Sequence, residues 1–506
     1  MTLEFDFVYS ANNDIFEYLL RFYAKDYSYT LEKQKDHYRF IIDGDEASLK
    51  TFCDSLNSMS HSMFLRQFDV KAAQAFVPCE FKHRDFSKFA FITYLNSKAY
   101  EEKKILSKNE WGVFCECEFA SDLEQFHMLN ENNFNSFLDL AFDLLTQEKS
   151  IFIKDKKGIY ELALFKGDFN CDFLLPCNIA AIHSVFVCSN ENLKFLASLE
   201  KPLMKLRLNA VFRKNYNLDF HDFKLKLPQD LFCFALGLKL FEKEYKFLSV
   251  KKIKEYEKDF QIMTLDDKFV VLEGFEFINT KARELIFSKE DKNLARISYI
   301  LSLYGEQAFI LELSKDYEDI LLINKELNLL KLSLPKDSKE LYDEIRKDQI
   351  GARLLENFAK EFPLLDESFK LKNNFYSLLC LLGRVLNLDE NLQKAGEELL
   401  KIADESKMPR GVKIDYRLKE DKSFDYTRTL RSTMSFMLAG VDSANIAYGA
   451  VESLAYFLRD TYDELREKKQ SQLAVVSGSL FEHKALLKNT LKHLKNCQLS
   501  DVPLRI

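Results

Sequence analysis

The segment Ser471–Asn496, SQLAVVSGSLFEHKALLKNTLKHLKN, shows where a strand passes into a helix. Its apolar run, Leu473–Val476, is typical of a short buried strand. Leu487, Leu491 and Leu494 then repeat three or four residues apart, as they would on one face of a helix. The segment therefore predicts a strand, a tight turn and a helix.

The turn itself, Ser477-Gly478-Ser479, is the first candidate binding site. The N–H groups in the first turn of a helix attract anions, because the helix dipole lies behind them. Glycine lets a ligand approach the backbone closely. We therefore predict that Ser477, Gly478 and Ser479 contact a phosphate or a carboxylate. The alternative interpretation is a strand-to-helix corner of an ordinary α/β domain.

Length and charge narrow the class of protein. The chain has 506 residues, 47% of them hydrophobic, which predicts about three or four domains with cores of their own. The 72 basic and 79 acidic residues are intermixed and give a net charge of −7, which argues against a nucleic-acid partner. The N-terminal MTLEFDFVYS lacks the features of an export signal, and no uncharged apolar stretch reaches about 18 residues. We predict a cytoplasmic protein that does not insert into a membrane.

Cysteine and histidine spacing indicates no metal site. The ten cysteines are scattered, as expected of reduced core residues in a cytoplasmic protein. Only Cys115-Glu116-Cys117 is close-set, and no C-x-x-C pair occurs, which argues against a zinc knuckle. The eight histidines form no H-x-x-x-H or H-E-x-x-H pattern. We therefore assign no metal ligand and no catalytic residue.

Glycine is scarce. Its 14 occurrences are under half of the usual frequency of about 7%. Neither G-x-G-x-x-G nor G-x-x-x-x-G-K-[ST] occurs, so the sequence lacks the common phosphate-binding loops. Phenylalanine is abundant at 46 residues, which predicts well-filled aromatic cores.

The first 74 residues predict a small α/β unit. Leu3–Tyr9 and Tyr38–Ile42 alternate like strands, and residues 14–23 and Ala47–Leu56 have helical spacing. This order fits a ferredoxin-like sandwich.

The remaining chain predicts further mixed structure. Strands are expected at Phe89–Tyr94 and Gly112–Phe119, and paired strands at Ser150–Ile153 and Ile159–Phe165. The pattern changes near residue 256, and helices dominate from Leu378. The longest predicted helix is Ser443–Lys468, whose apolar face we interpret as a core face. The predicted class is therefore α+β or α/β with several domains.

Several short segments together resemble the HypF-type carbamoyltransferases, which mature Ni/Fe-hydrogenases. Val476–Phe481, VSGSLF, is similar to that family's VLSGGVFQN, and Leu378–Leu399 is similar to its ALLG…EAAMEL stretch. Ser198–Leu203, SLEKPL, is similar to SPERPI. Phe16–Ala24 and Ile42–Asp45 are similar to the family's FRPFVYRLA and VEGD. The resemblance covers most of the chain.

The resemblance implies a division of the chain into four parts. These are an acylphosphatase-like ferredoxin sandwich (1–74), a degenerate zinc-finger-like insert (75–145), a YrdC-like α/β domain (146–255) and a Kae-type ASKHA domain (256–506). It also implies Lys154 as a candidate nucleotide or anion contact alongside the Ser477–Ser479 turn, and ATP or a carbamoyl-adenylate as the ligand if these sites survive.

This sequence departs from the family at the positions that carry chemistry. Glu17 and Lys33 stand where acylphosphatases need an arginine and an asparagine, and a carboxylate there would repel phosphate. Of the zinc cysteines only Cys79 lies near an expected position. The glycine-rich KG-x-GGFHL strand is reduced to Lys154-Asp-Lys-Lys-Gly158, and no HHxAH metal motif occurs.

These losses lead to our main hypothesis. The chain is an accessory protein that binds a hydrogenase subunit or another hydrogenase maturation protein, as a scaffold that has lost its catalytic residues. The first alternative is a surviving ATP-dependent enzyme that handles carbamoyl or adenylyl groups. The second is a relative of the tRNA threonylcarbamoylation proteins, against which the net negative charge argues.

Overall fold

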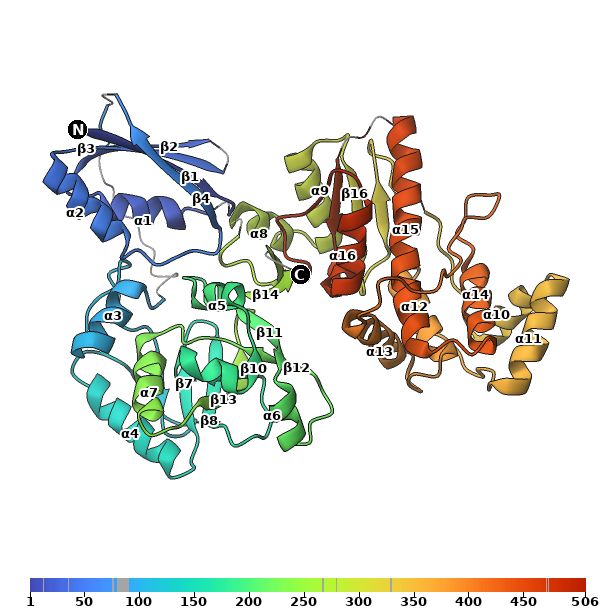
Figure 1. Ribbon diagram of the computed structural model, residues 1–506, viewed down its shortest axis with the longest axis horizontal. Coiled ribbons are helices and arrows are strands. Elements are labelled where there is room, and N and C mark those ends of the chain that lie inside the picture. Colours follow the sequence, from blue (N-terminus) through green and yellow to red (C-terminus); the bar gives the residue numbers. More distant parts are fainter. Residues whose placement is uncertain are drawn as a thin grey trace. The chain divides into compact units, whose positions relative to one another are not determined.

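The computed structural model describes residues 1–11, 13–34, 36–74, 77–79, 91–265, 268–278, 280–327, 330–469, 471 and 473–506 (Figure 1). The chain forms two compact units, Met1–Thr280 and Lys281–Ile506. The predicted start of the last domain at residue 256 differs from this division. Strands at 261–265 and 268–273 pair with the large sheet of the first unit, so the second unit begins at Lys281.

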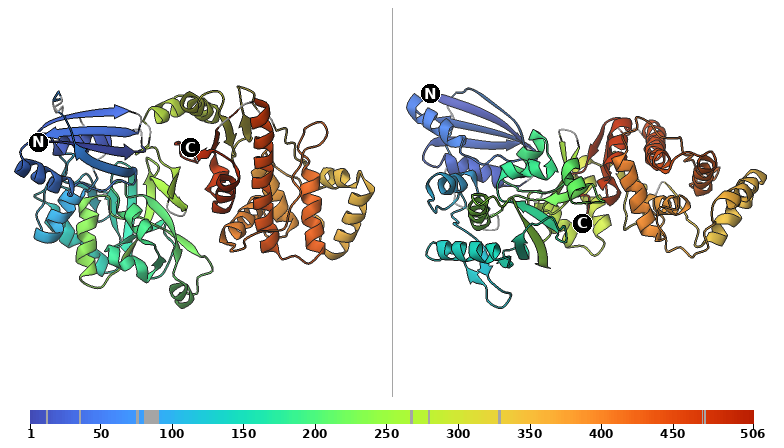
Figure 2. Two further views of the ribbon diagram at one scale, coloured as in Figure 1. Left: turned by 45° about the horizontal axis from the view of Figure 1, so that its top comes forward. Right: turned by 60° about the horizontal axis from the view of Figure 1, so that its bottom comes forward.

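The first unit opens with an antiparallel sheet in the order β2-β3-β1-β4. Helices α1 and α2 cover one of its faces (Figures 1 and 2). This is the predicted ferredoxin-like sandwich, to which the structure adds two strands, β2 and β4. The elements are β1 (Thr2–Tyr9), α1 (Ile15–Tyr23), β2 (Ser28–Gln34), β3 (His37–Asp43), α2 (Glu46–Leu56) and β4 (Leu65–Ala72).

Alternation of aromatic residues builds the core of this sandwich. Phe5 and Phe7 on β1 point to the helices, because successive side chains of a strand face opposite sides. Phe7 meets Phe16 of α1 edge-on, with ring centroids 5.2 Å apart. Phe5 meets Phe52 of α2 in the same way at 6.0 Å. On the other face, the Glu4 carboxylate forms ion pairs with Arg39 of β3 at 2.7 Å and with Lys71 of β4 at 2.9 Å.

A larger mixed sheet makes up the rest of the first unit, in the order β15-β14-β11-β12-β9-β13-β8-β7-β5-β6, with β10 beside β11. The elements are α3 (Tyr94–Lys103), β5 (Glu118–Ala120), β6 (His127–Met128), α4 (Phe134–Thr146), β7 (Ile151–Lys154), β8 (Gly158–Leu164), β9 (Phe173–Pro176), η2 (Ile179–Ser184), β10 (Phe186–Val187), α5 (Asn190–Ala197), β11 (Leu203–Leu208), α6 (Ala210–Asn215), β12 (Asp222–Leu225), α7 (Leu231–Phe241), β13 (Phe247–Glu255), β14 (Gln261–Leu265) and β15 (Lys268–Glu273).

Two of the strand predictions in this region need correction. The predicted pair at 150–153 and 159–165 is confirmed as the antiparallel strands β7 and β8. The strand predicted at 89–94 is wrong over its described part, since residues 91–93 are irregular and Tyr94 begins α3. Residues 89 and 90 lie outside the described part. A capping interaction decides this, because the Thr93 N–H donates to the Asn96 side chain at 2.9 Å. The strand predicted at 112–119 begins only at Glu118.

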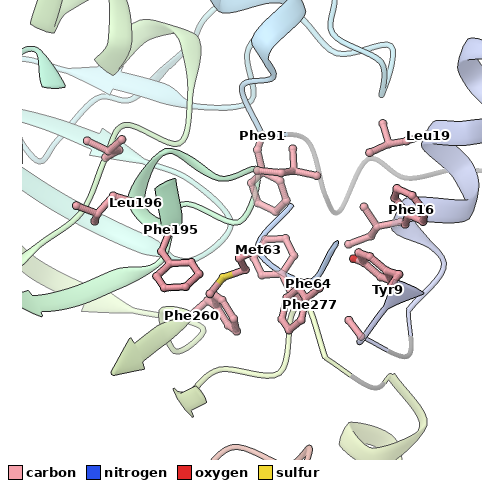
Figure 3. Packing of buried hydrophobic residues seen from close by; sticks show 14 of the residues in the cluster. Tyr9, Phe16, Leu19, Met63, Phe64, Phe91, Phe195, Leu196, Phe260 and Phe277 are labelled. Carbon is pink, nitrogen blue, oxygen red and sulfur yellow. The ribbon is translucent and has the colours of Figure 1, made fainter. Parts of the chain in front are cut away.

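The ferredoxin-like sandwich and the large sheet share one hydrophobic core. Figure 3 shows Tyr9 and Phe16 of the sandwich on one side and Phe195 and Phe260 on the other, with Phe64 between them. The Phe64 and Phe260 rings have centroids 6.1 Å apart. The two sheets of the first unit are therefore packed together instead of being linked by a chain segment alone.

The second unit has a four-stranded sheet in the order β17-β16-β18-β19, with helices around it (Figure 1). The pairs β16–β18 and β18–β19 are parallel. The elements are α8 (Thr280–Phe287), α9 (Lys292–Tyr304), β16 (Phe309–Glu312), β17 (Ile320–Leu322), α10 (Ser338–Arg346), α11 (Gln349–Glu361), α12 (Phe375–Val385), α13 (Leu392–Glu405), α14 (Tyr426–Leu438), α15 (Ser443–Lys469), β18 (Ala474–Ser477), η3 (Ser479–Glu482), α16 (Lys484–His493) and β19 (Cys497–Leu499).

Two features hold this second sheet in place. The long helix α15 buries an apolar face, and its Tyr462 ring packs against Phe309 of β16 at 5.1 Å between centroids. The predicted core role of this face is confirmed. Arg296 of α9 is 2% exposed and binds the Glu312 carboxylate of β16 at 3.0 Å and the Leu504 carbonyl at 3.1 Å.

Among the described residues, no helix is both long enough and apolar enough to cross a membrane.

Candidate functional site

The Ser477–Ser479 turn lies at the end of a central strand, as predicted. Strand β18 ends at Ser477, Gly478 adopts a φ of +105°, and the 3-10 helix η3 follows. Helix α16 begins five residues after the turn, at Lys484. The predicted order of strand, turn and helix is therefore confirmed, with one extra helical turn inserted before α16.

Gly478 allows close approach of the protein's own backbone. A Cβ atom at this position would lie 2.1 Å from the Leu313 carbonyl oxygen, which is shorter than any van der Waals contact. Hydrogen bonds hold the two segments together, from the Leu313 N–H to the Ser477 carbonyl at 3.0 Å and from the Leu480 N–H to the Leu313 carbonyl at 3.1 Å. The need for glycine is therefore explained without a ligand.

The two serines of the turn differ in their surroundings. Both are buried, and the Ser479 hydroxyl accepts a hydrogen bond from the Lys315 N–H at 2.9 Å. Ser477 is the last residue of β18 and lies opposite Glu312 of β16 in the parallel pair. Ser479 therefore fixes the backbone of the loop that follows β16.

The start of helix α16 already binds an acidic side chain. The Ala485 N–H donates to the Asp404 carboxylate at 2.7 Å, and the His483 Nδ1 atom lies 3.2 Å from the same carboxylate. An anion at this place is favoured by the helix dipole and the first-turn N–H groups. Here that anion is part of α13, so the Ala485 amide does not need an external phosphate.

A network of charges surrounds Lys315, next to the turn. The Lys315 ammonium lies 2.8 Å from Glu397 and 2.6 Å from Glu482, and Tyr376 donates a hydrogen bond to Glu397 at 2.7 Å. Although burial opposes ionisation, the hydrogen bond from Lys315 holds the pKa of Glu397 below its usual range. Lys315 is therefore neutralised by two carboxylates of the chain itself.

A pocket of about 270 Å³ opens beside this network. Its charged lining residues are Lys315, Asp316, Lys370, Lys372 and Glu397. The pocket is large enough for part of a nucleotide. It could not be predicted from sequence, because its lining comes from three separate segments.

Lys154, the other predicted contact, belongs to the first unit. Its ammonium lies 2.8 Å from the Glu118 carboxylate and 5.6 Å from the centre of the Phe126 ring. The hydrogen bond that the Lys154 ammonium donates to Glu118 raises the pKa of Lys154, so the side chain is charged and paired at neutral pH.

A cluster of buried charged residues in the first unit, one of them three positions after Lys154, was not predicted from the sequence. Lys157 is 1% exposed and lies 2.7 Å from Glu276, while Lys226 lies 2.5 Å and Lys252 lies 2.8 Å from Asp259. Although burial opposes ionisation, Lys226 and the other lysines hold the pKa of Asp259 far below its usual range. Lys157 and Glu276 are 119 positions apart in the sequence, so their pairing could not be predicted without the structure.

The structure also brings together Cys115, Cys117 and Asp230, whose ligand atoms all lie within 4.8 Å of one another. The sequence pointed to the close-set cysteine pair but not to Asp230, which follows 113 residues after Cys117.

No family model matches the chain. Protein HydE of Wolinella succinogenes is 25% identical to this chain in an alignment that covers 91% of this chain and 90% of that protein.

Two solved structures share the fold. One is full-length HypF in its phosphate- and nucleotide-bound form, with 10% identity and a TM-score of 0.55. The other is HypF of T. kodakarensis, with 12% identity and a TM-score of 0.57. Each comparison covers 100% of this chain and 96% of the other. The predicted resemblance is therefore confirmed: the chain is similar to HydE over nearly its whole length and has the fold of HypF.

Proposed function

We propose that this chain is an accessory protein for the maturation or assembly of a respiratory Ni/Fe-hydrogenase, and that it binds its partner as a scaffold without transferring a carbamoyl group. The similarity to HydE over 91% of the chain and the HypF fold support the assignment to hydrogenase maturation. The partner is a hydrogenase subunit or another maturation protein.

The observation that carries the scaffold role is the charge network around Lys315. A phosphate entering beside the Ser477–Ser479 turn would meet the carboxylates of Glu397 and Glu482, and the α16 start already holds Asp404. Like charges within a few ångströms repel each other strongly where water is partly excluded. The site therefore disfavours a phosphate unless the network rearranges.

The ferredoxin-like sandwich supports the same proposal. Glu17, at the position where acylphosphatases need arginine, forms an ion pair with Arg21 at 3.0 Å. Lys33, at the position where they need asparagine, lies with its ammonium 5.1 Å from the centre of the Tyr38 ring. The Glu17 carboxylate would repel a phosphate at this position, and the Lys33 ammonium is engaged with the Tyr38 ring.

A second candidate function rests on the pocket of about 270 Å³. Lys315, Lys370 and Lys372 line it, and lysines are common phosphate ligands. An active ATP-dependent carbamoyl- or adenylyl-handling enzyme would use them to hold the nucleotide.

Complementation of a deletion strain separates the two functions. We expect that loss of the gene abolishes processing of the hydrogenase catalytic subunit, and that the wild-type chain restores it. A Lys315→Met variant should also restore it if the chain is a scaffold, because the pocket then carries no reaction. Lys325→Met, which affects an exposed pair with Glu306, is the matched control.

Two results would count against this proposal. If deletion leaves subunit processing intact, the chain has no role in maturation. If folded Lys315→Met protein fails to restore processing while Lys325→Met succeeds, the enzyme is the better account. Circular dichroism of the purified variants establishes that each is folded.

A further inference from the structure

Two cysteines and an aspartate form a compact group of metal-binding atoms in the first unit. Cys115 and Cys117 flank Glu116 in an extended segment that leads into β5, so both thiols lie on the same side of the chain. Their Sγ atoms are 3.4 Å apart, and the Cys117 Sγ atom lies 3.6 Å from the Asp230 carboxylate.

The surrounding structure fixes these three groups. Asp230 precedes helix α7, and its carboxylate accepts a hydrogen bond from the Cys233 N–H at 2.8 Å. Cys117 is 1% exposed, and its carbonyl accepts a hydrogen bond from the Leu129 N–H at 3.1 Å. Such support keeps the donor atoms in place before any ion binds.

The distances fit a tetrahedral zinc ion. Zinc binds cysteine sulfur at about 2.3 Å and carboxylate oxygen at about 2.0–2.2 Å, so a tetrahedral site places sulfur and oxygen roughly 3.6 Å apart and two sulfurs roughly 3.8 Å apart. The observed sulfur–oxygen distance is 3.6 Å, and the sulfur–sulfur distance is 3.4 Å. The Cys115 sulfur lies within 4.8 Å of the Asp230 carboxylate, so a shift of Cys115 away from Cys117 and toward Asp230 would complete the geometry.

We propose that Cys115, Cys117 and Asp230 bind one Zn²⁺ ion. Two thiolates and a carboxylate form a donor set that favours zinc. Magnesium and calcium favour sites with oxygen ligands only. Asp230 also lines a cavity of about 50 Å³, which has room for a water molecule beside its carboxylate; such a water would be the fourth ligand. The site is separate from the Lys315 network and does not depend on the proposed function.

The opposing interpretation is a thiol–carboxylate hydrogen bond in a metal-free core. Cys117 would then donate to Asp230, and the Cys115 thiol would only pack beside it. Both interpretations explain the short distances, so metal binding itself is the observable that separates them.

The test is a titration of the full chain, freed of metal and kept reduced, with Co²⁺ and then with Zn²⁺. We expect one Co²⁺ per chain with a thiolate-to-cobalt charge-transfer band, which Zn²⁺ then removes. Loss of a residue that merely supports a metal ligand typically weakens binding 10–100-fold, so we expect Cys115→Ser and Asp230→Asn to weaken it at least about tenfold. Asparagine also caps helices, so Asp230→Asn keeps the α7 cap.

Cys171→Ser is the control, since Cys171 is a partly buried cysteine of the same unit outside the group. It should bind both metals like the wild type. The proposal is overturned if one equivalent of Co²⁺ gives no charge-transfer band, or if Cys115→Ser and Cys171→Ser bind with equal affinity.

Discussion

Substitution of Gly478 by alanine should destabilise the second unit whether or not the turn binds a ligand. The residue has a φ of +105° and a ψ of 156°, a conformation almost restricted to glycine. The added Cβ atom would lie 2.1 Å from the Leu313 carbonyl oxygen and 2.9 Å from the Leu313 nitrogen. Strands β16 and β18 must therefore separate locally or the turn must change conformation.

The magnitude follows from these two effects. A non-glycine residue in this backbone region costs about 1–3 kcal/mol. Forcing a methyl group into a packed site costs a further 1–3 kcal/mol or so. A total of about 4 kcal/mol, in a unit of this size, lowers the melting temperature by roughly 8–16 °C.

Gly440→Ala is the matched control in the same unit. Gly440 has a φ of +73°, but a Cβ atom there meets nothing within 4 Å, so only the backbone cost of about 1–2 kcal/mol applies. Scanning calorimetry of the full chain should show the larger shift for Gly478→Ala, in the transition of the second unit. Equal shifts for the two variants would refute the steric reasoning. If Gly478→Ala shows the larger shift, loss of function in a Gly478 variant does not by itself indicate a binding site.

Two further predictions concern charged residues. Arg296→Met leaves the buried Glu312 carboxylate unpaired and should destabilise the second unit by about 3–5 kcal/mol. Arg346→Met, which breaks an exposed pair with Asp343, should cost about 0–1 kcal/mol. Equal losses of stability for the two variants in calorimetry would contradict this prediction. The hydrogen bond from Arg39 lowers the pKa of Glu4 from 4.5 to about 2. The first unit should therefore lose stability as the pH falls from about 4.5 to about 2. Glu4→Gln should flatten this pH dependence. Acid unfolding can be monitored by the fluorescence of the chain's single tryptophan. An unchanged slope in the variant would show that Glu4 does not contribute.

Local patterns were sufficient for much of the fold. The apolar run at 473–476 and the regular spacing within 443–468 each report on a single element, and both are found as predicted. Strand β4 was missed although Phe68, Val70 and Ala72 alternate with Asp69 and Lys71, because the alternating run is short and its residues are exposed. The strand-like neighbours of Tyr94 predicted a strand there, but the capping interaction at Thr93 outweighs their β propensity and Tyr94 begins a helix.

The candidate sites depended on contacts between distant segments. The role of Gly478 follows from Leu313, which precedes it by 165 positions, and Lys315 is neutralised by Glu397 and Glu482. Sequence spacing says nothing of such partners. The zinc site likewise needs Asp230 beside Cys117, a proximity that only the folded sheet and helix α7 provide.

Direct binding to a hydrogenase subunit tests the central claim. The purified chain is titrated by calorimetry with the unprocessed catalytic subunit of a Ni/Fe-hydrogenase, with and without ATP, carbamoyl phosphate and magnesium. The scaffold account predicts a complex of the same affinity in both conditions and no consumption of ATP. A complex that forms only while ATP is consumed would contradict it, and so would the absence of a complex both with this subunit and with the other maturation proteins of the same hydrogenase.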